Sequence, residues 1–187
     1  MVFNGGTRFG FKGGIMRHLL VFGISLMSTS IGPLFAQGTA PVVDGASGPG
    51  EYTTTVNKGG MTVSFTLTPD KIYAACVSPG GGWVSIGLGS SGMSGATMFI
   101  GYVDDSGKPA FAVKKWSWFA LRDYKGVSPI SWAVATSGGK TTLEIALKRN
   151  DFIPSGQSSL KYIYAYANGK DFKTKHVSHG SGILPVN

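Results

Sequence analysis

The chain has 187 residues, a formal net charge of +8 and only 14% charged residues, whereas about a quarter is usual in soluble domains. Its length fits a single domain, and 29 glycines with 12% aromatic residues favour strands and turns. At 42% hydrophobic residues the composition excludes a disordered chain, and scattered basic residues without a recognised motif argue against nucleic-acid binding.

An export signal is predicted near the N-terminus. Arg17 precedes an apolar run over residues 19–31, and Ala36 supplies a small residue at a plausible cleavage point. This run is shorter than the roughly 20 residues that a spanning helix needs. We therefore expect a cleaved signal peptide over residues 16–36 and no stable membrane span afterwards.

Residues 1–15 fit this signal poorly and are interpreted as a mis-assigned N-terminal extension, with Met16 as the expected start. Export would place the mature chain in the periplasm or outside the cell. Arg8, Lys12 and Arg17 would leave with the leader, so three of the eight net positive charges do not belong to the mature domain.

The remaining chain reads as a lead-in followed by strands and turns. Residues 37–50 are rich in Gly, Ala and Pro and are expected to form a flexible lead-in to a domain over residues 51–187. Apolar and polar residues alternate with a period of two, and no window shows an apolar stripe at helical spacing. The expected strands are residues 62–68, 71–78, 83–88, 98–103, 110–113, 117–121, 130–135, 141–147, 160–167 and 183–186. About ten short strands predict an all-β fold, an antiparallel immunoglobulin-like β-sandwich.

Individual strands carry more specific expectations. Glu144 should point outward from the sandwich, because its neighbours Leu143 and Ile145 occupy inward positions. Tyr162 and the tyrosines two and four residues later should share one face. Cys76, the single cysteine, lies in an apolar strand and is expected to be a buried, inert thiol.

Met93 lies in a loop rich in Gly and Ser, where a thioether has little core to fill. Beyond the leader the chain has two histidines, His176 and His179. Binding groups concentrate in loops on rigid β scaffolds, and Met and His are axial ligands of haem iron. The absence of a C-x-x-C-H motif excludes the usual covalent haem attachment. In the alternative interpretation, Met93 fills a gap in the core and the histidines are solvated tail residues.

Four segments carry a resemblance to a known family. They are Gly82–Gly89 (GWVSIGLG), Met93–Ala96 (MSGA), Phe99–Asp104 (FIGYVD) and His176–Gly182 (HVSHGSG). Together they resemble the DOMON domain, whose pattern joins a Gly-Trp strand, a Met-x-Gly-x-Asp loop, an apolar strand ending Ile-Gly-Tyr and a closing His-x-x-Arg-Gly-Ser segment. Thr97 stands where the family often has Asp, and His179 where many members have Arg.

The resemblance implies a β-sandwich that, in several members, binds b-type haem through a Met and a His. By position, Met93 matches the axial methionine and His176 the first histidine of the closing segment. His179 stays open as the second ligand, with Lys173 or Lys175 as a further alternative. These lysines also suit the haem propionates. The aromatic residues available for an apolar haem pocket are Trp83, Phe99, Tyr102, Trp116, Trp118 and Phe119.

We therefore expect an exported b-type cytochrome domain that binds one haem b non-covalently, with Met93 and His176 on the metal. It would exchange electrons with a redox partner protein, membrane-bound or periplasmic. An enzyme is not expected, because iron with two axial protein ligands has no open position and no nucleophile motif is present. The alternative is a non-redox DOMON-like module that binds a carbohydrate or a cell-surface ligand.

Overall fold

The computed structural model describes residues 39–186, so the expected extension and signal peptide lie outside the described residues. Within this part the chain forms eleven β-strands, one 3-10 turn and no α-helix. None of the described residues belongs to a helix long and apolar enough to cross a membrane. The strands are β1 (Thr54–Lys58), β2 (Met61–Leu67), β3 (Lys71–Val77), β4 (Val84–Leu88), β5 (Thr97–Val103), β6 (Pro109–Ser117), β7 (Ala120–Asp123), β8 (Ser131–Ser137), β9 (Lys140–Lys148), β10 (Ser159–Tyr166) and β11 (Ser178–Pro185), and the 3-10 turn is η1 (Arg149–Asp151).

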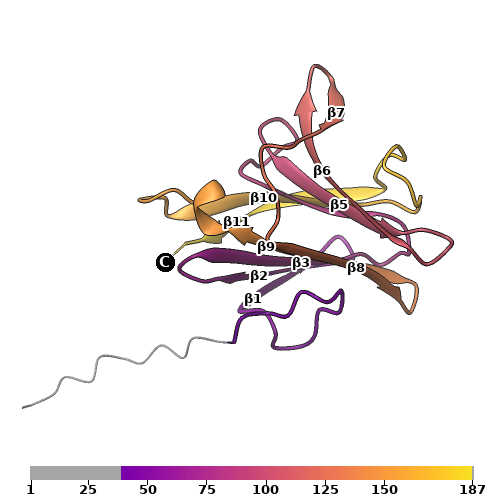
Figure 1. Cartoon of the computed structure of the whole chain (residues 1–187), viewed down its shortest axis with the longest axis horizontal. Coiled ribbons are helices and arrows are strands. Elements are labelled where there is room, and N and C mark those ends of the chain that lie inside the picture. Colours follow the sequence, from indigo (N-terminus) through magenta and orange to yellow (C-terminus); the bar gives the residue numbers. More distant parts are fainter. Residues whose placement is uncertain (1–38, 187) are drawn as a thin grey trace, which may run out of the picture. The chain divides into compact units, whose positions relative to one another are not determined.

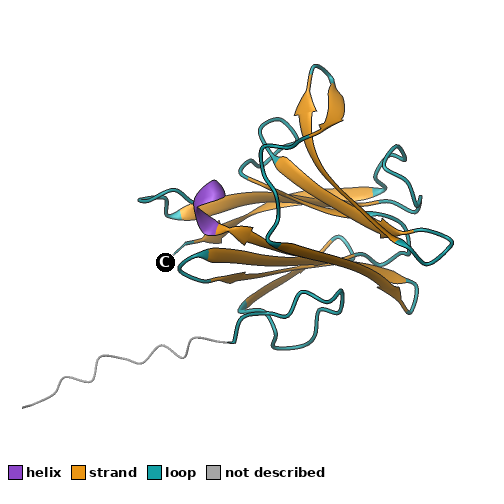
Figure 2. Ribbon diagram, viewed as in Figure 1, coloured by secondary structure: helices purple, strands orange, loops and turns teal. Residues whose placement is uncertain are grey.

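The strands form two sheets, which confirms the predicted all-β antiparallel sandwich. One sheet has five strands in the order β1-β2-β3-β9-β8, and the other has six in the order β11-β10-β4-β5-β6-β7. All neighbouring strands are antiparallel. The sheets lie face to face, and the β6–β7 hairpin projects beyond them (Figure 1). Loops join the strands at both ends of the sandwich (Figure 2).

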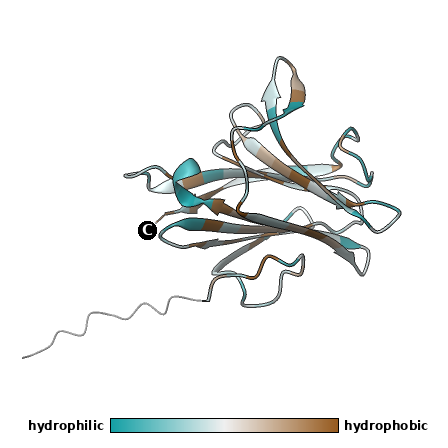
Figure 3. Ribbon diagram, in the orientation of Figure 1, coloured by the Kyte–Doolittle hydropathy of each residue, from teal (hydrophilic) through white to brown (hydrophobic). Residues whose placement is uncertain are grey.

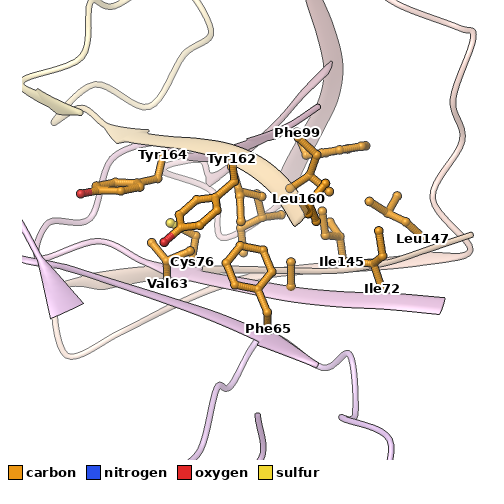
Figure 4. Packing of buried hydrophobic residues seen from close by; sticks show 14 of the residues in the cluster. Val63, Phe65, Ile72, Cys76, Phe99, Ile145, Leu147, Leu160, Tyr162 and Tyr164 are labelled. Atoms are coloured by element: carbon orange, nitrogen blue, oxygen red, sulfur yellow. The ribbon is translucent and has the colours of Figure 1, made fainter. Parts of the chain in front are cut away.

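The core lies between the sheets, where inward-facing apolar residues of both layers meet. Hydrophobic segments are visible on strands of both sheets (Figure 3). Phe65 from β2 packs on Tyr162 from β10 with ring centroids 4.8 Å apart, so this pair joins the two layers (Figure 4). Tyr162 and Tyr164 are buried on the expected shared face. Cys76 is also fully buried there, and burial raises the pKa of its thiol, as expected for an inert cysteine.

The observed strands differ from the expected ones in three places. No strand was expected at β1, because this edge strand is half-buried or exposed along its whole length and shows no apolar alternation. The expected strand over residues 117–121 is instead a tight turn, with Trp118 and Phe119 between β6 and β7. The last strand starts at Ser178, five residues earlier than expected. Its Gly180 pairs with Tyr164, whose ring lies where a β-carbon would stand, and this supports a glycine-rich strand.

Glu144 points outward from the sandwich as predicted, but it is fully buried. The lead-in covers it: the N–H groups of Asp44 and Gly45 donate to Glu144 Oε2 at 3.1 and 2.7 Å. The Tyr52 hydroxyl donates to Glu144 Oε1 at 2.8 Å. Burial, followed by the hydrogen bond to this carboxylate, raises the pKa of Tyr52. These bonds attach the lead-in to the outer face of the five-stranded sheet.

Candidate functional site

A cleft of about 720 Å³ lies on the face of the six-stranded sheet that points away from the five-stranded sheet. Its floor follows from strand alternation. Phe99 of β5 points into the main core, so Met98 and Ile100 on either side of it point into the cleft. In the same way, Ile163 and Ala165 of β10 face the cleft. The cleft therefore has an apolar floor made by the second faces of two central strands.

Two loops and the β6–β7 hairpin, through its Trp116 and Leu121, border this floor. The β4–β5 loop contributes Met93, and the loop between β10 and β11 contributes His176. His179, the second residue of β11, also lines the cleft. The structure thus brings all three of these sequence-predicted site residues to one cleft. The two histidines are also in contact with each other: their imidazole rings meet edge to face with centroids 4.6 Å apart.

The loop around Met93 is shaped by its small residues. Gly89 and Gly95 have φ values of 96° and 88°, a conformation that favours glycine. Between them, the Ser90 hydroxyl donates to the carbonyl of Ser94 at 2.8 Å. Met93 takes no part in these contacts and is 38% exposed. It does not fill the core, and its thioether is free to meet a ligand in the cleft.

The loop that presents His176 is held from both sides. The Asp171 carboxylate accepts hydrogen bonds from the N–H groups of Lys173 and Thr174 at 2.6 and 2.7 Å and from the Thr174 hydroxyl at 2.6 Å. These bonds, the hydroxyl bond first among them, lower the pKa of Asp171. From the sheet, Trp83 Nε1 donates to the carbonyl of Thr174 at 2.9 Å. The position of His176 therefore depends on Trp83 and Asp171.

His176 is half-buried, whereas His179 is exposed. Burial lowers the pKa of His176, and the nearby His179 and Lys175 act in the same direction. A lowered pKa favours the neutral imidazole, and this is the form that binds a metal. Of the two histidines, His176 has the surroundings better suited to a ligand.

Aromatic residues make up part of the cleft wall. Phe172 lines the cleft and packs edge to face on Tyr102, with centroids 4.9 Å apart. Trp83 and Trp116 also line it, as expected. The other four expected pocket aromatics do not line the cleft. Tyr102 packs against Phe172 and Phe99 belongs to the main core, while Trp118 and Phe119 stand at the tip of the β6–β7 hairpin.

Sequence reasoning missed several lining residues, namely Met98, Ile100, Leu121, Ile163, Ala165 and Phe172. A signal was present for those in β5 and β10, because both strands are apolar at inward and outward positions alike. Such runs are typical of strands covered on both faces. No comparable pattern marked Phe172, which reaches the cleft from an irregular loop.

The donor set suits a haem better than a bare metal ion. Within residues 39–186 no three His, Cys, Asp or Glu side chains gather into a group that could hold a metal. A haem iron needs only two axial protein ligands, and a thioether with an imidazole is an established pair. The cleft volume lies within the range of about 300–1,000 Å³ that is usual for ligand sites. Lys173 and Lys175 line the same cleft and can meet carboxylate groups.

No family model and no curated protein matches the chain. Solved structures do share its fold. One is the cytochrome b domain of pyranose dehydrogenase from Coprinopsis cinerea, with 16% identity, a TM-score of 0.53, and coverage of 67% of this chain and 76% of that chain. Another is the cytochrome domain of Myriococcum thermophilum cellobiose dehydrogenase, with 12% identity, a TM-score of 0.52, and coverage of 72% and 81%. At these identities the likeness establishes a common fold: this chain folds as these two cytochrome domains do.

Proposed function

We propose that this protein is a DOMON-type electron-transfer module that binds haem b non-covalently in the cleft, with Met93 and His176 as axial ligands. The observation that carries the proposal is the meeting of Met93, His176 and His179 at one apolar cleft, although Met93 lies more than 80 residues before the two histidines in the chain. The fold shared with two cytochrome domains supports it. An exported location, periplasmic or secreted, is part of the proposal.

The bound haem would supply a reversible one-electron couple at its iron. With a methionine and a histidine on its two axial positions, the iron would have no open site, which favours electron transfer over oxygen chemistry or catalysis. The apolar floor at Met98, Ile100 and Ile163 would exclude water from the macrocycle. Lys173 and Lys175 would pair with the propionate groups.

His176 is the preferred second ligand. It is the more buried of the two histidines, and its loop is anchored by Trp83 and Asp171. His179 packs against its ring and would orient it. Ligation by His179 instead would place the iron on an exposed residue of β11.

A carbohydrate-binding module is less well supported by the surface. Sugar recognition by stacking calls for exposed aromatic rings on an open platform. Within residues 39–186 the most exposed aromatic residues, Trp118 and Phe119, stand instead at the convex tip of a hairpin. Trp132 is 41% exposed, but its ring stacks on Phe111 with centroids 4.6 Å apart, so one of its faces is already covered.

Reconstitution with haem tests the ligand assignment. We expect Met93→Ala and His176→Ala each to lose the low-spin visible spectrum of the reduced protein. His179→Ala is the matched control and should keep that spectrum. Loss of the spectrum in His179→Ala with retention in His176→Ala would move the ligand to His179. Unchanged spectra in all three variants would contradict the proposed site.

A further inference from the structure

The turn between β6 and β7 carries two large aromatic residues in an unfavourable backbone conformation. Trp118 and Phe119 are the two residues of this hairpin loop, and their φ values are 50° and 60°. Two-residue hairpin loops of this kind favour Asn-Gly or Gly, because residues with a β-carbon are strained at positive φ. They are the only non-glycine residues with positive φ that the structure shows within residues 39–186.

The strain has no compensation in packing. Trp118 is 84% exposed and Phe119 is 92% exposed. The hairpin projects away from the two sheets (Figure 1), and hydrophobic segments are visible within it (Figure 3). Two pairs below the tip, Trp116 and Leu121 face each other across the strands and line the cleft. The tip residues lie outside that cleft, so they serve neither the core nor the candidate haem site.

The hairpin is also basic. Lys115 and Arg122 face each other on the side opposite Trp116 and Leu121, and Lys125 is exposed just beyond β7. The hairpin's one acidic residue, Asp123, is paired with Lys114 at 2.7 Å. The aromatic tip therefore stands above a positively charged stem.

We propose that the β6–β7 hairpin binds anionic membrane surfaces, with Trp118 and Phe119 entering the interfacial layer and Lys115, Arg122 and Lys125 meeting lipid headgroups. Aromatic residues favour the bilayer interface, and basic residues near an anionic leaflet add attraction. The convex shape favours a membrane over a protein partner. A protein would need a pocket to receive the tip, whereas the interfacial layer accepts it without one. This inference does not depend on what occupies the cleft.

A turn variant separates binding from folding. In the double variant Trp118→Asn with Phe119→Gly, the tip takes the residues that its backbone prefers. We expect its melting temperature to equal or exceed that of the parent protein. In co-sedimentation with phosphatidylcholine vesicles containing roughly one quarter phosphatidylglycerol, it should bind about tenfold or more weakly, because two apolar side chains are lost from the contact.

Two further variants serve as controls. Ile183→Ser removes a residue that is 62% exposed on β11, and it should bind the vesicles as the parent protein does. Lys115→Gln with Arg122→Gln should weaken binding to the anionic vesicles by about fivefold per charge and leave binding to pure phosphatidylcholine vesicles unchanged. Added salt should likewise weaken the binding of the parent protein to anionic vesicles.

The proposal fails if the parent protein does not sediment with anionic vesicles, or if the turn variant binds them equally well. It also fails if the turn variant has a lower melting temperature, because the aromatic tip would then serve folding. Equal weakening by Ile183→Ser would indicate nonspecific adsorption. The haem spectrum, recorded on the same samples, should not change in any of these variants and keeps this test separate from that of the cleft.

Discussion

Replacing Trp83 with phenylalanine should loosen the loop that presents His176 and leave the sandwich folded. Trp83 is 7% exposed and belongs to the apolar cluster that forms the cleft floor with Met98 and Ile100. Its Nε1 donates to the carbonyl of Thr174 at 2.9 Å, two residues before His176. Phenylalanine keeps an apolar ring but has no donor. The backbone bond from the N–H of residue 83 to the carbonyl of Gly169, 2.9 Å long, remains.

The expected cost follows from the lost bond and the smaller ring. A neutral hydrogen bond contributes about 0.5–1.5 kcal/mol net, and a partly buried carbonyl without a donor costs more. Exchange of the indole for a phenyl ring adds about 1 kcal/mol of lost burial. We expect the free energy of unfolding to fall by about 2 kcal/mol. If roughly 1.4 kcal/mol of this must be recovered to order the loop on ligand binding, haem affinity falls about tenfold.

Haem titration and guanidinium unfolding, measured on the same variant, test both values. Trp132→Phe is a matched control, because Trp132 stacks on Phe111 and does not line the cleft. It should lose some stability and keep the haem affinity of the parent protein. Haem binding by Trp83→Phe as tight as that of the parent, or an equal loss of affinity in both variants, would contradict a role of Trp83 in holding the His176 loop.

Three further predictions concern the scaffold. Tyr52→Phe removes the hydroxyl that donates to Glu144 at 2.8 Å, so denaturant unfolding should show a loss of about 1–3 kcal/mol with an unchanged haem spectrum. Because the pKa of Tyr52 is raised above its ordinary 10.0, its contribution is complete below pH 10 and declines as the pH rises further. The free energy of unfolding should thus fall more steeply above pH 10 in the parent than in Tyr52→Phe, and equal slopes would contradict this. Gly101→Ala would place a β-carbon against Val134 between the sheets, so thermal unfolding should show a loss of about 1–3 kcal/mol, and an unchanged melting temperature would contradict the packing.

The sequence predicted the sandwich because its central strands have clear signals. The alternation in β2 and β9 and the apolar runs of β3 and β4 follow directly from burial on one or both faces. The polar edge strand β1 has no such signal, since solvent accepts any side chain along it. The glycines of β11 suggested a loop, although they face tyrosines across the ladder.

The candidate site was predicted in part. Met93 stood out because a thioether is unusual in a Gly/Ser loop, and the histidines stood out because they are scarce. Their meeting depends on the order of strands in the six-stranded sheet, where β10 lies between β11 and β4. Periodicity within single strands carries no information on this order. The anchoring of the His176 loop by Trp83 likewise joins residues 91 positions apart and has no local signature.

The hairpin tip shows a different limit. Trp118 and Phe119 have strong strand propensity, and the sequence there lacks the Asn or Gly that marks a two-residue loop. The strand prediction over residues 117–121 failed for this reason. Trp118 and Phe119 depart from the turn preference for Asn or Gly although they pack against nothing. Such departures are common where a surface has a function of its own.

The central claim is that the cleft between the Met93 loop and the His176 loop holds a haem. Its most direct test is the visible spectrum of the purified protein during titration with haem. We predict saturation at one haem per chain and a low-spin, split-band spectrum on reduction, as expected for iron held by methionine and histidine. A protein that stays colourless in excess haem, or takes it up with only the spectrum of free haem, would contradict the account.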